Sequence, residues 1–340
     1  MRNSVLVFFL FLLIASCKEA DDPIQQMVES YDVLVLNEGN FRSANASLSL
    51  YSSETNEVLE KVFHSNNSGR PLGDVAQSFL THNGKGFIVV NNSNKIEVVN
   101  LSDFKSIGKI DGLNSPRYIL PVGGDKAYVS DLYEDEIYVV DLESLAILKK
   151  IRTDGWTEEM VLVADKAFVT QVDSNQVLVF DVNTDTLISK IETSIAPMSI
   201  ALDINQRIWI GCTGGLSMGK PALMQIDPNS FQILKKMEIQ NINASIGSLE
   251  FNASKDKLFF LNTDLYRIDI QDSVLPNMPY IRSNNRNFYA YGINPFNDEI
   301  YISDAIDFQQ NGVIYRYNSN AQEIGNFYAG LIPGFIDFLP

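Results

Sequence analysis

The stretch from Pro116 to Ile151 reads PRYILPV, GGD, KAYVSDL, YED, EIYVVDL, ESL and AILKKI. Four segments rich in apolar, β-branched and aromatic residues alternate with three tripeptides that contain glycine or polar residues. Segments of this composition favour β-strands, and Gly, Asp and Ser favour tight turns between them. The stretch therefore predicts a small antiparallel sheet of four strands.

The same pattern recurs along the chain, and its third strand ends in Asp, Asn or Ser. These endings lie at Ser52, Asn100, Asp141, Asp181, Asp227, Asp269 and Asn318. The successive steps are 48, 41, 40, 46, 42 and 49 residues. A four-stranded propeller blade has a period of about 40 to 50 residues. Seven endings thus predict an all-β fold, a seven-bladed β-propeller.

The two ends of the chain are expected to share one blade. Residues 31–63 provide three strand-like segments and lack the innermost one. Residues 333–338 (PGFIDF) are similar to the phrase PRYI at 116–119, which opens an innermost strand. We therefore expect the C-terminal strand to complete the first blade. Such closure removes the exposed strand edges of an open sheet.

The N-terminus predicts export and a lipid anchor. Arg2 precedes an apolar run at 5–14 (VLVFFLFLLI), which is too short to span a bilayer and leads into Ile-Ala-Ser-Cys at 14–17. This tetrapeptide fits a bacterial lipobox, in which Cys17 becomes the acylated N-terminus. We expect a signal peptide at 1–16, a lipidated cysteine with a flexible tether at 17–30, and a propeller domain at 31–340.

The tether also bears on location. Lys18 is followed by the acidic sequence EADD at 19–22, which resembles the export signal that sends lipoproteins of Bacteroidetes-type bacteria to the outer leaflet. We expect an outer-membrane lipoprotein exposed at the cell surface. A periplasm-facing anchor is the alternative.

Charge and cysteine content limit the partners. The chain has 26 Lys and Arg against 42 Asp and Glu. This acidic field repels nucleic acid and anionic lipid, so we expect no nucleic-acid partner and membrane contact through the anchor alone. The two cysteines are Cys17 and Cys212. Acylation of the first excludes an intramolecular disulfide, and the second follows an apolar run that predicts a buried, inert thiol.

The connections between strands fall into two classes. Loops from the second to the third strand of a blade, and loops between blades, are long and carry aromatic residues, as at 37–46, 131–136, 152–159 and 281–289. The other connections are short polar turns. Connections that only join strands need neither length nor aromatic side chains. We therefore expect a ligand over the channel mouth on the face of the long loops, the loop-rich face, rather than on the opposite, short-turn face.

The candidate ligand-binding residues lie in these loops or at strand ends beside the mouth. Aromatic side chains would supply flat contact area, and amides and carboxylates would supply directional hydrogen bonds. The candidates are Asn37, Glu38, Asn40, Phe41, Asp74, Gln77, Asn91, Arg117, Tyr118, Asp131, Tyr133, Trp156, Glu158, Glu159, Gln171 and Tyr289. Turn capping is the alternative role for Asn37, Asp74 and Asp131. Packing between blades is the alternative for Tyr118 and Tyr289, and pairing with an acid is the alternative for Arg117.

Signals for catalysis are sparse. His64 and His82 are the only histidines and are expected on opposite faces, which disfavours a metal site or a Ser-His-Asp triad. Glu158 and Glu159 could form a carboxylate pair for glycoside or lactone chemistry, although adjacent acids are more often solvated. We expect no enzymatic activity, no cofactor and no metal.

The blade pattern resembles that of YncE-like, or surface-layer-type, propellers, because the third strands end in apolar-x-apolar-Asp rather than Trp-Asp. More specific phrases are NEGNF at 37–41, GDVAQS at 73–78, VVNNS at 89–93 and SPRY at 115–118. These resemble a family of Bacteroidetes surface lipoproteins. The family includes the BtuG-type propellers, which capture cobalamin for a TonB-dependent transporter.

This resemblance implies a surface lipoprotein that binds a small molecule, with cobalamin or another corrinoid as the named ligand, and delivers it to an outer-membrane transporter. A protein- or glycan-binding module of the envelope is the first alternative, and a propeller-type lyase or lactonase is the second. A concave pit with an aromatic rim would favour small-molecule binding. A flat apolar face would favour a macromolecular partner, and a buried metal or paired acids in the channel would favour an enzyme.

Overall fold

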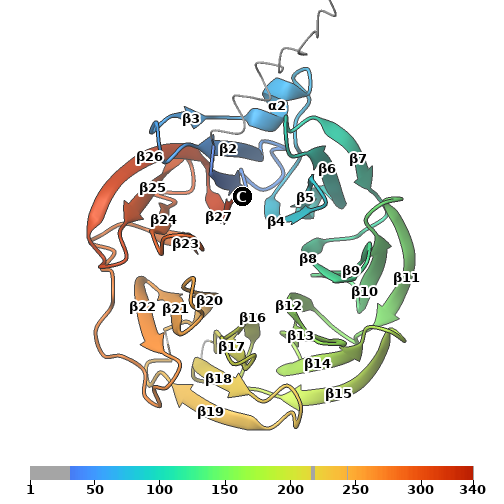
Figure 1. Cartoon of the computed structure of the whole chain (residues 1–340), viewed down its shortest axis with the longest axis vertical. Coiled ribbons are helices and arrows are strands. Elements are labelled where there is room, and N and C mark those ends of the chain that lie inside the picture. Colours follow the sequence, from blue (N-terminus) through green and yellow to red (C-terminus); the bar gives the residue numbers. More distant parts are fainter. Residues whose placement is uncertain (1–30, 216–218, 243, 340) are drawn as a thin grey trace, which may run out of the picture.

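The chain folds into seven small antiparallel sheets arranged in a ring around a central channel (Figure 1). The computed structural model describes residues 31–215, 219–242 and 244–339. The expected seven-bladed β-propeller is confirmed. The expected signal peptide, Cys17 and the tether lie outside the described residues. Within the described residues, no helix is long and apolar enough to cross a membrane.

The first four blades each have four strands, which follow one another from the channel outward. Blade 1 comprises β27 (Pro333–Phe338), β1 (Val33–Asn37), β2 (Ser47–Tyr51) and β3 (Val58–Leu59). Blade 2 comprises β4 (Ala76–His82), β5 (Lys85–Val90), β6 (Lys95–Asn100) and β7 (Ser106–Ile110). Blade 3 comprises β8 (Pro116–Gly123), β9 (Lys126–Asp131), β10 (Glu136–Asp141) and β11 (Ala146–Arg152). Blade 4 comprises β12 (Thr157–Val163), β13 (Lys166–Gln171), β14 (Gln176–Asp181) and β15 (Thr186–Glu192).

The remaining blades follow the same plan, except that blade 6 has three strands among the described residues. Blade 5 comprises β16 (Pro197–Leu202), β17 (Ile208–Cys212), β18 (Ala222–Ile226) and β19 (Ile233–Glu238). Blade 6 comprises β20 (Gly247–Phe251), β21 (Lys257–Asn262) and β22 (Asp264–Asp269). Blade 7 comprises β23 (Phe288–Ile293), β24 (Ile300–Asp304), β25 (Asn311–Tyr317) and β26 (Glu323–Leu331). A short helix α2 (Val62–Asn66) and a 3₁₀ turn η1 (Asn91–Ser93) lie in loops.

The repeated Asp or Asn at the end of the third strand shapes the turn to the fourth. Asp141 Oδ1 accepts a hydrogen bond of 2.6 Å from the Ser144 amide, and Asp181 Oδ1 accepts one of 3.0 Å from the Thr184 amide. Asp227 makes the same bond to the Ser230 amide at 3.0 Å. A side-chain oxygen at this position holds the turn without help from distant residues. This local requirement explains the period in the sequence.

The last strand closes the ring as expected. β27 pairs antiparallel with β1, so that Ile336 faces Val35. Asn37 reinforces the junction with blade 7, because its Oδ1 accepts the Gly330 amide at 2.8 Å. The rings of Tyr51 in blade 1 and Phe327 in blade 7 stack with centroids 3.9 Å apart. The first and last blades are therefore joined by backbone pairing, an amide bond and apolar contact.

The core lies between neighbouring blades rather than in one central cluster. Phe87 and Val89 of β5, for example, pack in one buried cluster with Val129 of β9 and Tyr138 of β10. Each sheet is thus packed against its neighbours, and most residues of its second strand are buried. A propeller of this kind leaves the channel free of aliphatic core packing, so polar side chains can enter it.

Candidate binding site at the loop-rich mouth of the channel

A β-bulge lies near the first residue of each innermost strand in blades 2 to 7. The pairing with the second strand shifts between Ala76/Ser78, Pro116/Ile119, Thr157/Met160, Pro197/Ser199, Gly247/Leu249 and Phe288/Tyr291. A bulge takes residues out of the ladder and re-aims their side chains. The bulged positions include Gln77, Arg117, Tyr118, Glu158, Glu159 and Tyr289, all of which belong to the predicted set.

Blade 1 fills its position at the mouth with a residue from a loop. The pairing of β27 with β1 skips Gly334, because Leu36 faces Phe335 and Asn37 faces Pro333. A Cβ atom on Gly334 would lie only 2.3 Å from Glu38 Oε1. The missing side chain therefore leaves room for Glu38, which follows β1. Glu38 and the bulged residues Gln77, Arg117, Glu158, Glu159 and Tyr289 form what we call the polar ring.

An ion pair organises one side of this ring. Arg117 Nε donates to both oxygens of Glu158, at 2.8 and 3.1 Å, and Arg117 Nη1 donates to Gln77 Oε1 at 2.5 Å. The indole Nε1 of Trp156 donates to Glu158 Oε1 at 2.7 Å. Glu158 is 1% exposed. Blades 2, 3 and 4 are therefore connected across the channel mouth by four of the predicted residues.

The other side of the ring is a second, smaller pair. Tyr289 of blade 7 donates its hydroxyl proton to Glu38 Oε1 at 2.9 Å. Burial raises the pKa of Glu38 above its usual range, although the bond from Tyr289 and the charge of Arg117 oppose this shift. Burial and the charge of Glu38 also raise the pKa of the Tyr289 hydroxyl.

Glu159 lies next to the ion pair and has no cation of its own. Its Oε2 accepts the backbone amide of Ile200 at 3.0 Å. Burial raises its pKa to about 8, and the neighbouring charge of Glu158 adds to the shift. Burial likewise raises the pKa of Glu158, although Arg117 counteracts the effect. The expectation that these adjacent acids are solvated is therefore wrong, because the bulge of β12 leaves Glu158 buried and Glu159 half-buried.

Exposed aromatic side chains, the aromatic rim, lie in loops on the same face as the polar ring. Phe41 is 61% exposed and Tyr133 is 74% exposed. Tyr289 makes an edge-to-face contact with Phe308, with ring centroids 5.4 Å apart. Asn40, next to Phe41, connects its own loop to the loop of Phe308, since its Nδ2 donates to the Phe308 carbonyl at 3.0 Å. The face thus offers exposed aromatic surface in the loops that surround the fixed polar groups.

Five predicted residues are buried and hold the loops in place. The Asp131 carboxylate accepts backbone amides of Ser115, Tyr133 and Glu134 at 2.6 to 3.0 Å. Comparable bonds occupy the side chains of Asn37, Asp74, Asn91 and Gln171. Tyr118 also points inward, and burial raises its pKa well above the usual value. The structure therefore separates the predicted set into loop supports, a polar ring and an aromatic rim.

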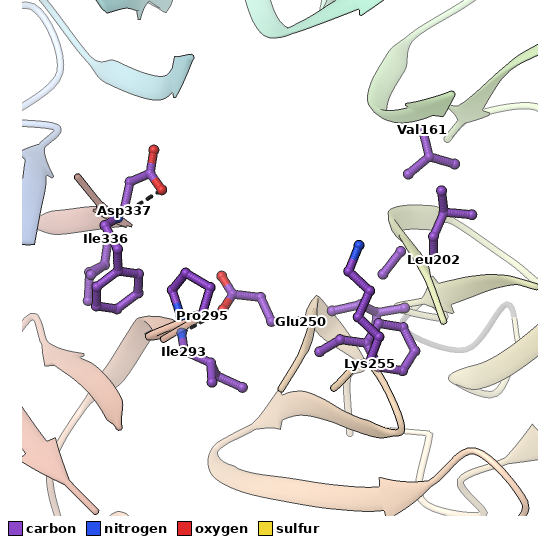
Figure 2. Close-up of a pocket in the computed structure, with 12 residues that line it drawn as sticks. Val161, Leu202, Glu250, Lys255, Ile293, Pro295, Ile336 and Asp337 are labelled. Atoms are coloured by element: carbon purple, nitrogen blue, oxygen red, sulfur yellow. Dashed lines mark hydrogen bonds between the residues drawn. The ribbon is translucent and has the colours of Figure 1, made fainter. Parts of the chain in front are cut away.

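The prediction missed the opposite end of the channel. A cavity of about 440 Å³ lies there, lined mainly by residues at the ends of five innermost strands; Figure 2 shows the side chains that line it. Glu250, Lys255 and Asp337 are its charged residues. Glu250 and Asp337 are acids within otherwise apolar innermost strands. This irregularity in the sequence is the signal that could have indicated them as channel residues. Among the described residues, no group of three or more His, Cys, Asp or Glu side chains is placed to hold a metal ion.

A family comparison identifies the chain as a whole. The model of a domain of unknown function, DUF5074, matches residues 31–328. The chain belongs to the DUF5074 family. The match covers all seven blades, from β1 to within β26, and omits the closing strand β27. No curated protein matches this DUF5074 chain in sequence.

Solved structures support the fold of this DUF5074 chain. A quinonprotein alcohol dehydrogenase-like protein from Bacteroides thetaiotaomicron is 14% identical, with a TM-score of 0.73 over 92% of this chain and 78% of that one. A functionally unknown protein from Desulfotomaculum acetoxidans is 11% identical, with a TM-score of 0.69 over 91% and 99%. Hydrazine synthase from Kuenenia stuttgartiensis is 14% identical, with a TM-score of 0.59 over 74% and 85%. Identities this low show a shared fold alone.

Proposed function

We propose that this DUF5074 propeller is a surface lipoprotein that binds a small molecule at the loop-rich mouth of its channel and delivers it to an outer-membrane transporter. The candidate ligand is a corrinoid such as cobalamin, and the candidate relatives are YncE-like and BtuG-type propellers. The observation that carries the binding role is that the exposed aromatic side chains of Phe41, Tyr133 and Tyr289 share one face with a ring of hydrogen-bonded polar side chains.

The arrangement suits a large, partly apolar ligand with amide groups. Aromatic side chains give contact area at a low cost in conformational entropy, and fixed polar groups orient the ligand. The ring residues already hold one another in the free protein, through the bonds from Arg117 to Glu158 and from Tyr289 to Glu38. A preorganised site loses less freedom when it binds.

The course of the chain supports the orientation that a tethered receptor needs. Asp32 lies on the short-turn face, where its carboxylate accepts the amide and hydroxyl of Ser53 in the turn after β2. A tether attached before residue 31 would therefore begin at the short-turn face. The loop-rich mouth would point away from the membrane.

The binding proposal is tested by titrating cyanocobalamin calorimetrically into a protein of residues 24–340. We expect a saturable one-to-one isotherm. Phe41→Ala and Tyr133→Ala should each weaken binding about tenfold, since buried aromatic anchors dominate binding energy. Tyr328→Ala is the matched control, because Tyr328 is 65% exposed on the outer strand β26. Absence of heat at all concentrations would exclude the corrinoid, and an equal effect of all three variants would exclude the rim as its site.

The anchor and the delivery step need cellular tests. Cys17→Ala should move the protein from the membrane fraction to the soluble fraction, whereas Cys212→Ala should leave it in the membrane. In cells that depend on external corrinoid, Phe41→Ala combined with Tyr133→Ala should slow uptake. Normal uptake by protein that has lost binding in vitro would contradict delivery to a transporter.

A propeller-type lyase or lactonase is the second candidate, and the state of Glu159 favours it. A carboxyl group with a pKa near 8 can exchange a proton at neutral pH. Tyr118 and the Arg117–Glu158 pair adjoin it. Turnover of a lactone or uronate substrate that Glu159→Gln abolishes, with the fold intact, would support this function over a receptor. The proposed envelope module for proteins or glycans would instead show binding of such a partner that Tyr133→Ala weakens.

A further inference from the structure

The cavity at the short-turn end of the channel is separate from the polar ring and the aromatic rim. Its lining comes from the C-terminal ends of β12, β16, β20, β23 and β27. The polar ring lies at the N-terminal ends of the innermost strands. Val161, Leu202 and Ile336 supply apolar walls, and Glu250, Lys255 and Asp337 supply charge (Figure 2). Its volume of about 440 Å³ falls within the range of small-molecule sites.

Among the described residues, neither acid in this cavity is paired with a cation. Glu250 Oε2 accepts the Ile293 amide at 2.9 Å, and Asp337 Oδ1 accepts the Phe338 amide at 2.8 Å. Each carboxyl group therefore has one oxygen left toward the cavity. Burial raises the pKa of both groups, and the charges of Asp337 and Glu159 raise that of Glu250 further. No cation contributes to the pKa of either group.

The cation at the edge of the cavity is also without a partner. Lys255 follows β20 in the turn to β21, and its side chain extends into the opening in Figure 2. Twenty ion pairs connect other charged residues of the described chain, but Lys255 takes part in none of them. The cavity thus presents two carboxyl groups and one ammonium group that do not satisfy one another, with aliphatic surface between them.

We propose that this cavity is a second binding site, which takes a small apolar zwitterion: a free amino acid or a dipeptide with an aliphatic side chain. The ligand ammonium would lie against Glu250 and Asp337, its carboxylate against Lys255, and its side chain against Val161 and Ile336. Hydrogen bonds between charged groups are strong in a partly dry site. A simple cation would leave Lys255 unpaired, and a simple anion would meet two acids.

The test compares ligands that differ in one charge. Leucine and leucyl-leucine are titrated calorimetrically into the wild-type protein, beside N-acetyl-leucine, which lacks the ammonium, and leucinamide, which lacks the carboxylate. We expect saturable binding of at least one zwitterion, and at least about tenfold weaker binding of both single-charge analogues, since tenfold corresponds to about 1.4 kcal/mol. Equal binding of leucinamide would overturn the role of Lys255, and equal binding of N-acetyl-leucine would overturn the role of the acids. Absence of binding by both zwitterions would overturn the site.

Variants then assign the contacts. Lys255→Gln should remove the preference for the zwitterion over its amide, and Glu250→Gln should remove the preference over its N-acetyl form. The glutamine oxygen in Glu250→Gln can still accept the Ile293 amide, so the fold is expected to survive. Glu143→Gln is the matched control, an exposed acid on the same face paired with Lys85 at 2.6 Å. Loss of both preferences in this control would overturn the assignment. Cyanocobalamin titrated into the saturated protein tells the two sites apart, because the two ligands should not compete.

Discussion

Replacement of Glu159 by glutamine should make the protein more stable, and increasingly so as the pH rises. The folded state raises the pKa of this carboxyl group from 4.5 to about 8. Between these values the folded protein keeps a proton that the unfolded chain has lost. Stability therefore falls as the pH increases through this window, by about 1.4 kcal/mol per pH unit for one group. Glutamine resembles the protonated carboxyl group and does not titrate.

The magnitude follows from the width of the window. At pH 7.5, three units above the unfolded value, Glu159 should cost about 3 to 4 kcal/mol relative to pH 4.5. For a folded domain of about 300 residues this corresponds to a difference of about 5 °C in Tm between the wild type and Glu159→Gln. The glutamine oxygen can still accept the Ile200 amide, which Glu159 binds at 3.0 Å. The two proteins should therefore melt together near pH 4.5.

Thermal melts of both proteins at half-unit steps from pH 4.5 to 8.5 provide the assay. The difference in Tm should grow with pH up to about pH 8, the folded pKa of Glu159, and level off above it. Asp165→Asn is the control, since a hydrogen bond from Lys166 lowers the pKa of this exposed carboxyl group and its contribution is constant above pH 5. A difference between wild type and Glu159→Gln that is the same at every pH would show that Glu159 does not retain its proton on folding.

Three further outcomes are expected. Arg117→Met leaves Glu158 buried without its cation, so denaturant unfolding at pH 7.5 should show a loss of about 3 to 5 kcal/mol; a loss below about 1 kcal/mol would contradict this. Ile336→Ala should lower the free energy of unfolding by about 2 to 5 kcal/mol, because this side chain in the closing strand is only 5% exposed. Its control is Ile324→Ala on the outer strand β26. Ile324 is 46% exposed, so the free energy of unfolding should change by less than about 0.5 kcal/mol. The thiol of Cys212, whose pKa burial raises to about 12, should resist a thiol-specific reagent at pH 8 until denaturant is added, and rapid labelling of the native protein would disprove its burial.

The number of blades could be predicted because it depends on local chemistry. Asp141, Asp181 and Asp227 each shape the turn that follows them, through bonds to amides three residues away. A requirement of this kind leaves the same mark in every repeat. The closing strand was also predictable, since PGFIDF at 333–338 has the composition of an innermost strand and lacks the three partners that would follow it.

The site was only partly predictable because its geometry depends on register. The bulge in β12 turns both Glu158 and Glu159 inward, whereas their position next to the loop suggested solvated acids. Glu38 reaches the mouth only because Gly334, at the other end of the chain, has no side chain. Glu250 is an acid in an otherwise apolar strand, but its neighbours in the sequence do not show which side chains it meets in the channel. Periodicity in the sequence does not encode such contacts between distant strands.

The closure of blade 1 sets the order of events during synthesis. β27 is the last strand of the propeller along the chain, and it pairs with β1, the first. Joining ends that are about 300 residues apart costs on the order of 5 kcal/mol in chain entropy, which strand pairing and the burial of Ile336 must offset. Until those final residues emerge, six blades and a partial seventh sheet can form only an open arc with an unpaired edge at β1. A propeller that lacks this strand therefore exposes the edge of β1 to proteases and chaperones. In the closed ring the same edge is paired and protected.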